Sequence, residues 1–372
     1  MKKSFIFVAL AGLALSSCVN DENQNVVETA QQPLAFGTPV MNIQTKGNVM
    51  GEIEGTSYPS GENFMVYCKA YTGNFNGWTN SANASNYFAA TGEEAVNSNP
   101  SSGSKYWNTA TTHYWPEATY QLAFAAYSPS DAANDAESIE HTAAGLQIAG
   151  FQTHADANMQ YDLMFSNREY NLNKNNNGSS SVKIKFNHAL SSIVFSAQRG
   201  QEDINYNITD LKLVGSFYQK GDFSQGIVET PAISGGAYAE AATPAWSNLT
   251  ENTSITYEPS FNTFEVPHVD PLQFTKGTSA LLLIPQTLPA DAKVIVYYDE
   301  ITNKGKASEK ILSYEREINL SEFATEQGVK VNTWEMGKRY VYRIAFGASN
   351  PIYFEPSISD WEQLPTLIYT IN

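Results

Sequence analysis

Three pairs of carboxylates are the residues in this sequence whose spacing could support catalysis. They are Glu93 with Glu94, Asp299 with Glu300, and Asp131 with Asp135. Two carboxylates that face each other across a sugar can hydrolyse a glycosidic bond, one as acid and the other as base or nucleophile. Acidic pairs in polar segments are usually solvated, however, and the sequence has no G-x-S-x-G elbow and no phosphate-binding glycine loop. We therefore expect no enzymatic activity.

The histidines and acidic loops do not have the spacing of a metal or cofactor site. The five histidines include no pair at i, i+4 and no HExxH or cysteine-plus-histidine arrangement. His188 follows a strand-like run, and we expect it to make a structural hydrogen bond. Asp131, Asp135 and Glu137 in DAANDAE offer oxygen ligands for calcium, but they do not follow the twelve-residue EF-hand pattern. We expect no cofactor.

Four tryptophans in or near loops suggest a different chemistry, the binding of sugars. They are Trp78, Trp107, Trp115 and Trp246. Exposed tryptophans can stack on sugar rings, whereas buried ones hold loops over an apolar core. We expect the buried arrangement, and a glycan-binding platform built from Trp78 or Trp107 is the alternative.

Cys18 ends the N-terminal segment at a position that predicts covalent lipid attachment. Two lysines precede the apolar run of residues 5–15, which is too short to span a bilayer. A basic start, a short apolar run and small residues before a cut site are typical of an export signal. The letters LSSC at its end resemble a bacterial lipoprotein signal, in which the cysteine is acylated. We therefore predict a signal peptide over residues 1–17 and a lipid on Cys18 that anchors the chain.

The charge of the chain argues against binding to nucleic acid, and its two cysteines leave no intrachain disulfide. The chain has 38 acidic and 22 basic residues, and its formal net charge is −16 at pH 7. Nucleic acids attract basic surfaces, so this balance argues against a nucleic acid partner. With Cys18 attached to lipid, Cys68 has no partner for an intrachain disulfide. Its apolar strand-like surroundings predict a buried thiol.

Alternating apolar residues predict short strands along most of the chain after the signal. Segments such as NFMVYCKAY, YQLAFAAYSP, VKIKF and RYVYRIAF are separated by loops rich in glycine, asparagine, serine and proline. The segment KVIVYYDEITNKGKASEKILSYEREI predicts two strands joined across Asn303 to Gly305. Many short strands with turns between them indicate β-sandwiches. The asparagine-rich segment from Asn171 predicts a domain boundary near Ser180.

Five segments occur in an order that resembles a known family. They are YWPEATYQLAFAAYSP, MQYDLMFSN, VKIKFNHALSSIVFSA, LLLIPQTL and WEMGKRYVYRIAFGASNPIYFEPSISDW. Together they are similar to the fimbrillin (Mfa-like) family of Bacteroides-type fimbriae, also called type V pili. The resemblance covers nearly the whole chain after the signal.

The resemblance implies an all-β fold of two tandem transthyretin-like β-sandwich domains without enzymatic activity. We expect a tether and removable first strand over residues 18–46, an N-terminal sandwich over residues 47–180 and a C-terminal sandwich over residues 181–372. The resemblance also implies export to the cell outer membrane as a surface lipoprotein, and assembly with other fimbrial subunits into a fimbrium. If the subunit is also adhesive, we expect it to bind a ligand on a host or bacterial surface.

The family's assembly assigns a role to the first strand and to the loop behind it. A protease cuts this loop, the lipid and the strand leave, and a strand of the next subunit fills the exposed sheet edge. Leu34 and Phe36 in PLAFGTPV are the candidates for the residues that fill the groove. Lys46, followed by Gly47, is the first basic residue after the signal and stands where the family commonly has an arginine.

The end of the chain contains the candidate for the donated strand. Leu367, Tyr369 and Ile371 alternate in LPTLIYTIN. Only eleven residues follow Trp361, so this segment is expected either to be donated or to pair within its own domain. The alternative function is a glycan-binding surface lipoprotein that keeps its tether uncut.

Overall fold

The structure is a computed structural model that describes most of the chain beyond residue 32. The chain divides into two units, Met1–Gln31 and Gln32–Asn372, and every described residue belongs to the second. The described residues are 33–37, 52–53, 58–73, 75, 77–78, 84–102, 106–177, 181–230, 239–251, 254–324, 328–347, 362–363 and 367–371.

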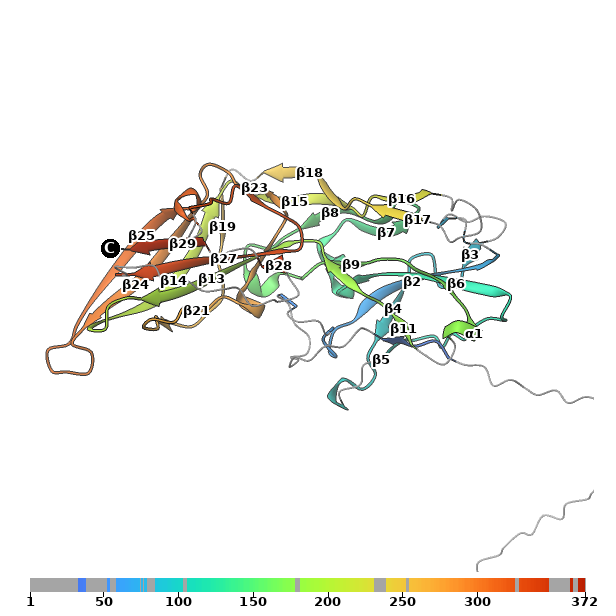
Figure 1. Cartoon of the computed structure of the whole chain (residues 1–372), viewed down its shortest axis with the longest axis horizontal. Helices are drawn as coiled ribbons and strands as arrows, with labels where there is room; N and C mark the ends of the chain where they lie inside the picture. Colours follow the sequence, from blue (N-terminus) through green and yellow to red (C-terminus); the bar gives the residue numbers. More distant parts are fainter. Residues whose placement is uncertain are drawn as a thin grey trace, which may run out of the picture. The chain divides into compact units, whose positions relative to one another are not determined.

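Nearly all of the described elements are β-strands, as the alternating sequence predicts (Figure 1). The largest sheet has the order β11-β1-β5-β4-β2-β6-β9-β12, with β10 beside β6 and β3 beside β2. Its strands are β1 (Phe36–Gly37), β2 (Phe64–Thr72), β3 (Ala84–Asn86), β4 (Glu93–Val96), β5 (Tyr106–Thr109), β6 (Tyr120–Ser128), β9 (Met164–Ser166), β10 (Glu169–Leu172), β11 (Val182–Lys183) and β12 (Phe186–His188).

Two other sheets come from the second half of the chain. One has the order β21-β13-β27-β28, with β22 beside β13 and β29 beside β27, and the other has the order β19-β14-β24-β25, with β20 beside β14. Their strands are β13 (Ser191–Arg199), β14 (Ile204–Gly215), β19 (Ile255–Tyr257), β20 (Phe264–Glu265), β21 (Leu272–Gln273), β22 (Leu281–Leu283), β24 (Lys293–Thr302), β25 (Lys310–Asn319), β27 (Lys338–Phe346), β28 (Glu362–Gln363) and β29 (Leu367–Ile371).

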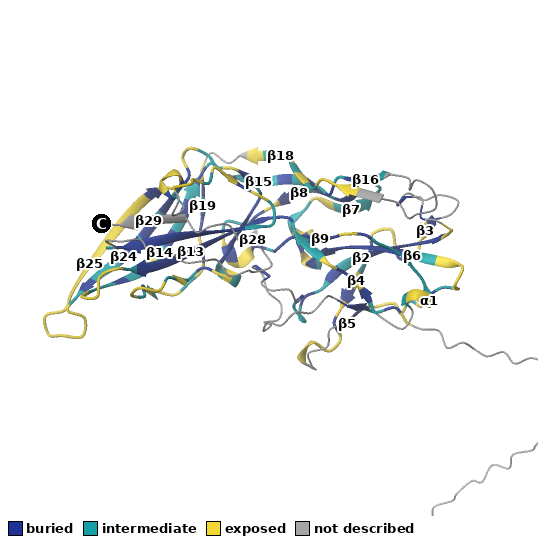
Figure 2. Cartoon of the chain, in the orientation of Figure 1, coloured by how far each residue is buried: buried dark blue, intermediate teal, exposed yellow. Residues whose placement is uncertain are grey.

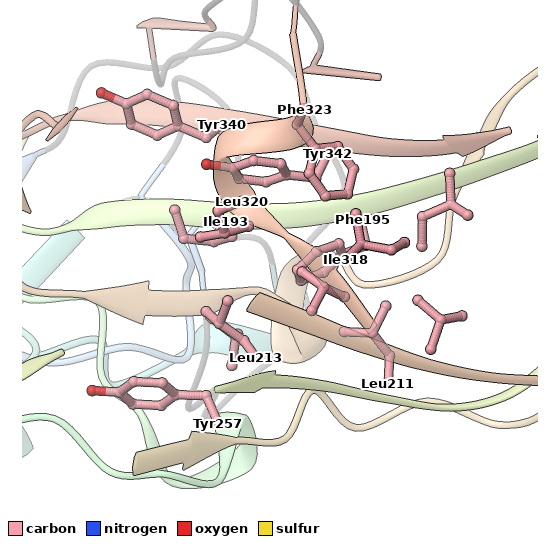
Figure 3. Close-up of a cluster of buried hydrophobic side chains, with 14 of the residues drawn as sticks. Ile193, Phe195, Leu211, Leu213, Tyr257, Ile318, Leu320, Phe323, Tyr340 and Tyr342 are labelled. Carbon is pink, nitrogen blue, oxygen red and sulfur yellow. The ribbon is translucent and has the colours of Figure 1, made fainter. Parts of the chain in front are cut away.

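These two sheets pack face to face as a β-sandwich around one apolar cluster. Ile193, Phe195 and Tyr342 come from β13 and β27, while Leu211 and Leu213 come from β14, and all five are fully buried (Figure 3). Alternate residues of each strand enter the cluster because successive side chains of a strand point to opposite faces. The alternation read from RYVYRIAF is therefore confirmed as the core pattern of β27.

A four-stranded sheet combines strands from distant parts of the sequence. Its order is β18-β15-β8-β7, from β7 (Ser138–Thr142), β8 (Gly145–Gln152), β15 (Tyr218–Ser224) and β18 (Ala245–Glu251). This sheet therefore contains strands from both sides of the domain boundary expected near Ser180. That boundary stays a prediction. Two small sheets pair β16 (Ile227–Thr230) with β17 (Ala239–Ala242), and β23 (Gln286–Thr287) with β26 (Thr333–Trp334).

Helices are few and short in the described part of the chain. One α-helix, α1 (Lys174–Asn177), lies in the asparagine-rich segment, and the 3-10 turns are Pro100–Ser102, Ser130–Asp135, Ala157–Met159, Gly277–Ser279 and Leu320–Glu322. None of the helices among the described residues has the length and apolar character needed to cross a membrane.

The long hairpin of β24 and β25 confirms the two strands predicted across Asn303 to Gly305. The strands pair without a register shift from Lys293 opposite Asn319 to Thr302 opposite Lys310. Asn303 and Gly305 have φ angles of 55° and 78°. This left-handed backbone is tolerated by glycine and asparagine, which explains why these residues occupy the turn.

A buried ion pair connects residue 52 to the β-sandwich that contains β13 and β27. The Glu52 carboxylate accepts hydrogen bonds from Arg339 Nε at 2.9 Å and from Ser192 Oγ at 2.5 Å. The side chain of Glu52 is 0% exposed and that of Arg339 is 5% exposed. Since Arg339 lies on β27 and Ser192 on β13, the pair fixes residue 52 against both strands.

The next residue is fixed to a different part of the protein. The backbone N–H of Ile53 donates to Asp162 Oδ2 at 2.9 Å, and the other oxygen of Asp162 pairs with His188 Nδ1, also at 2.9 Å. His188 belongs to β12 of the largest sheet. Residues 52–53 therefore link that sheet to the β-sandwich that contains β13 and β27, and the structural hydrogen bond predicted for His188 is confirmed.

Replacing Glu52 with glutamine should destabilise the folded protein strongly. The variant leaves the Arg339 guanidinium buried without its counter-charge, which typically costs about 3–5 kcal/mol. Chemical denaturation of Glu52→Gln measures this free energy of unfolding. Glu265→Gln is the control, because its pair with Lys304 is exposed and should contribute less than about 1 kcal/mol. Equal losses in the two variants would contradict the role of the buried pair.

Candidate functional site

The predicted removable segment lies as a strand inside the largest sheet. β1 pairs in parallel with β11, with Phe36 opposite Val182, and antiparallel with β5, with Phe36 opposite Trp107. The side chains of Leu34 and Phe36 are 5% and 0% exposed. Leu34 and Phe36, the two residues expected to fill a groove, are therefore both buried.

Backbone hydrogen bonds hold this segment on both of its edges. Leu34 N–H donates to the carbonyl of His113 at 2.8 Å on one side. On the other side the carbonyls of Ala35 and Gly37 accept from Val182 N–H at 2.8 Å and Ile184 N–H at 3.0 Å. Removal of the segment would leave these donors and acceptors unpaired, which is costly in a protein interior.

Phe36 fits into a cluster of aromatic rings. Its ring packs edge to face against Phe124 at a centroid distance of 5.6 Å, and against Phe64 and Phe88 at 6.2 Å each. Such pairs contribute about 0.5–1.5 kcal/mol beyond simple burial. Trp107, Val66 and Leu122 belong to the same buried cluster, so Phe36 lies within a continuous apolar lining.

β1 also joins two parts of the sheet that would otherwise be separate. Among the described strands, β11 pairs only with β1. Three residues further along the chain, β12 pairs with β9 at the other end of the sheet order. β1 therefore closes the seam between β5 and the segment that begins at Val182.

The C-terminal residues of the chain lie beside β27. β28 pairs in parallel with the start of β27, and β29 pairs in parallel with its second half, from Leu367 opposite Tyr342 to Ile371 opposite Phe346. In the described part of the chain β29 has β27 as its only partner strand. The backbone of the candidate donor residues Leu367, Tyr369 and Ile371 is thus at an edge of its own sandwich.

The predicted lipid and processing sites, Cys18, Lys46 and Gly47, lie outside the described residues. Arg168, the first arginine of the chain, is buried with a side chain that is 0% exposed. It forms an ion pair with Glu229, donates to the carbonyl of Thr142 at 2.6 Å and lies 4.8 Å from the centre of the Trp78 ring. A protease that cuts after arginine therefore has no access to Arg168 in the folded chain.

In each pair of carboxylates considered for catalysis, at least one member has a hydrogen-bonding partner. Glu93 pairs with His113 at 2.9 Å, Asp135 pairs with His154 at 2.8 Å, and Asp299 accepts a hydrogen bond from Ser313 at 2.6 Å. Within the described ranges, no group of three histidine, cysteine, aspartate or glutamate side chains is arranged to hold a metal ion. Cys68 is a free, buried thiol as predicted, and burial raises its pKa well above the ordinary value.

Three of the four loop tryptophans are buried as expected, and Trp246 is partly buried against the core. Trp78, Trp107 and Trp115 are 3%, 1% and 5% exposed, and Trp246 donates its indole N–H to the carbonyl of Ala189 at 2.8 Å. Trp78 and Trp107 therefore do not form the exposed platform that the glycan-binding alternative requires.

Two important contacts were not identified from the sequence. Phe88 follows no recognisable strand pattern, and the pairing of Glu52 with Arg339 joins residues 287 positions apart. Neither has a local signal, because both depend on how distant segments pack.

Truncating Phe36 should weaken the uncut protein. Phe36→Ala removes the ring from a fully buried position, and such changes cost about 3–5 kcal/mol. Chemical denaturation of the uncut chain measures the loss. Tyr106→Ala is a suitable control, since Tyr106 lies opposite Gly37 on β5 but is 57% exposed, so its truncation should cost less than about 1 kcal/mol. An equally small effect of Phe36→Ala would show that β1 is not tightly packed.

Comparison with known structures finds chains of similar length and low identity. A fimbrial protein from Bacteroides vulgatus ATCC 8482 is 20% identical, and the match covers 76% of this chain and 88% of that one with a TM-score of 0.43. A provisionally assigned cell adhesion protein from Bacteroides uniformis ATCC 8492 is 12% identical over 85% and 94% of the two chains, also with a TM-score of 0.43. TM-scores below 0.5 support no inference about this chain.

Sequence comparison is more informative. No curated protein matches the chain. The sequence model of the fimbrillin-like family, in contrast, matches residues 59–361, which is well over half of the chain. The chain therefore belongs to the fimbrillin-like family, whose members are structural proteins rather than enzymes.

Proposed function

We propose that this chain is a fimbrial subunit that reaches the outer membrane as a lipoprotein and assembles by exchange of β1. The observation that carries the proposal is the burial of Leu34 and Phe36 in a segment that is hydrogen-bonded on both edges. The lipid is attached to Cys18, residues 18–46 form the tether with the removable strand, and the sandwiches are of the transthyretin type.

Processing creates the acceptor in this proposal. A cut after Lys46 separates β1 from Gly47, so β1 can leave together with the lipid. Its departure opens a groove lined by Phe64, Phe88 and Phe124 and exposes the edges of β5 and β11. An open apolar groove with unpaired backbone groups is a strong template for another strand.

The end of the chain supplies a matching donor strand. Residues 34–36 read Leu-Ala-Phe, and residues 367–369 read Leu-Ile-Tyr. In this register Leu367 replaces Leu34 and Tyr369 replaces Phe36, since alternate residues of a strand enter the groove. β29 is available for donation because it is held along one described edge, by its pairing with β27.

The ion pair of Glu52 explains why processing would not loosen the rest of the chain. Glu52 lies five residues after Gly47 and is bound to β27 and β13 through Arg339 and Ser192. The new N-terminus therefore stays tied to the folded subunit by a buried contact, while everything before it is free to leave.

Intact mass spectrometry of protein taken from the cell surface tests the processing step. The wild-type chain is expected to begin at Gly47 and to carry no lipid. Lys46→Gln should remain lipidated at Cys18, whereas the exposed control Lys276→Gln should be processed normally. A wild-type chain that begins at lipidated Cys18 would overturn the proposal and favour a permanently anchored surface protein.

Substitution in the donor strand tests the exchange step separately. Tyr369→Asp would place a carboxylate in the aromatic groove, where an unpaired charge is strongly unfavourable, so polymers should be lost while processing continues. Thr370→Asp is the control, because neighbouring residues of a strand face opposite sides. Electron microscopy and the size of surface polymers are the readouts. Polymers of normal length from Tyr369→Asp would exclude this strand as the donor.

A further inference from the structure

One histidine lies between the four-stranded sheet and the largest sheet. His141 belongs to β7, and its ring packs against Trp78 at a centroid distance of 4.4 Å and against Tyr67 of β2 at 5.5 Å. β2 is buried along most of its length (dark blue in Figure 2). Tyr67 and Trp78 share one buried apolar cluster with Leu146 of β8, so the ring of His141 lies against an apolar layer between the two sheets.

The ring of His141 has no polar partner in this layer. Both of its nitrogen atoms are buried, and neither forms a hydrogen bond to any residue that the structure describes. Nearly all buried polar side chains in proteins have such a partner, so a side chain that lacks one calls for an explanation. An apolar ring of similar size could occupy this place without leaving a polar atom unpaired.

Two positive charges lie near this ring. Arg168 is 4.8 Å from the centre of the Trp78 ring and donates to the carbonyl of Thr142, the residue after His141, at 2.6 Å. Lys69 belongs to β2 and is buried. Burial lowers the pKa of His141 well below its ordinary value, and the charges of Arg168 and Lys69 lower it further.

The acidic groups around the ring are turned away or already paired. Glu140 precedes His141 on β7, so its side chain points to the opposite face of the strand, and it is exposed. Glu229 of β16 is bound by Arg168 and by a backbone N–H at 2.8 Å. The other titratable groups at this place are phenols, which are uncharged at neutral and acid pH, namely Tyr67 and Tyr127. A proton on the ring would therefore be placed near two positive charges without an ion-pair partner among the described residues.

Three other histidines have the opposite surroundings. His113, His154 and His188 each have a carboxylate oxygen within 2.9 Å of a ring nitrogen. A proton on these rings would strengthen an existing contact, because the ring and the carboxylate would then carry opposite charges. Of these four histidines, His141 is the one whose protonation the surrounding structure opposes.

We propose that His141 makes the contact between β7 and the largest sheet sensitive to acid, so that β7 and β16 loosen from β2 as the pH falls below about 6.5. Protonation places a third positive charge beside Arg168 and Lys69. Because both ring nitrogens are buried, the charged ring reaches water only if the end of β7 moves. This movement separates Thr142 from Arg168 and disturbs the pair that Arg168 forms with Glu229.

The direction of the effect follows from which state binds the proton. The pKa of histidine in an unfolded chain is about 6.5, and the pKa of His141 in the folded protein is lower. Between these two values the opened segment holds one more proton than the closed one, so acid favours opening. Each pH unit below about 6.5 should raise the equilibrium constant for opening by up to about tenfold, and above that pH the equilibrium should be constant.

Hydrogen exchange of the β7 amides that pair with β8 tests the proposal. The full, uncut chain carries Cys18→Ser and Lys46→Gln, so it has no lipid and keeps β1. After correction for the chemical effect of pH on exchange, protection should fall by up to about tenfold per pH unit below about 6.5. In His141→Phe, which keeps an apolar ring without a titratable atom, protection should stay constant. His154→Phe is the matched control and should retain the fall, because the ring of His154 is 41% exposed.

A second variant keeps the test decisive if His141→Phe does not fold. Lys69→Met removes one of the two nearby charges, so the pKa of His141 should rise and the loss of protection should end at a higher pH. The proposal is overturned if protection in the parent chain does not change with pH, or if it falls equally in His141→Phe. An end point in Lys69→Met equal to that of the parent chain also overturns it. Because the chain is uncut, these outcomes are independent of whether processing and polymer formation occur.

Discussion

The packing of Phe36 among Phe64, Phe88 and Phe124 is the contact on which the largest sheet depends. It places a short strand between β5 and β11, where the strand closes the seam of the sheet and satisfies backbone groups on both sides. The same strand has few residues and lies at the beginning of the described chain. Because β1 completes the core with so few residues, another strand could replace it by exchanging only a short length of chain.

β27 connects this seam to the other end of the chain. Its residue Arg339 holds Glu52 in a buried ion pair, and its backbone pairs with β28 and β29. A buried pair of this kind adds little net stability compared with apolar packing, but either charge left alone would be costly. It therefore acts mainly to specify where residues 52–53 lie. Residues 52–53, which follow the proposed cut, and the proposed donor strand β29 are therefore both attached to β27.

The edges of the sheets differ in a way that bears on assembly. β1 is paired on both sides, β29 is held by β27, and the outer side of β25 has no partner among the described strands. Backbone groups at an open edge drive association because pairing satisfies them, and exposed apolar side chains add area to bury. For a member of a family of fimbrial structural proteins, edges of this kind rather than a cleft or a metal site are where function is expected.

The sequence by itself determined the all-β class, the apolar faces of the strands and the family. The alternation of apolar residues in RYVYRIAF, and at Leu34 and Phe36, could be recognised from the sequence. The reason is that the two-residue period of a strand is a local property. The turn at Asn303 to Gly305 could be predicted for a similar reason, because asparagine and glycine are the residues that most readily adopt a left-handed backbone. Only the tertiary structure decided that Glu52 meets Arg339, that β15 joins β8 across the expected boundary, and that the outer side of β25 has no partner among the described strands. These features depend on contacts between residues far apart in the chain, and no local pattern encodes which distant segment fills the space beside a given strand.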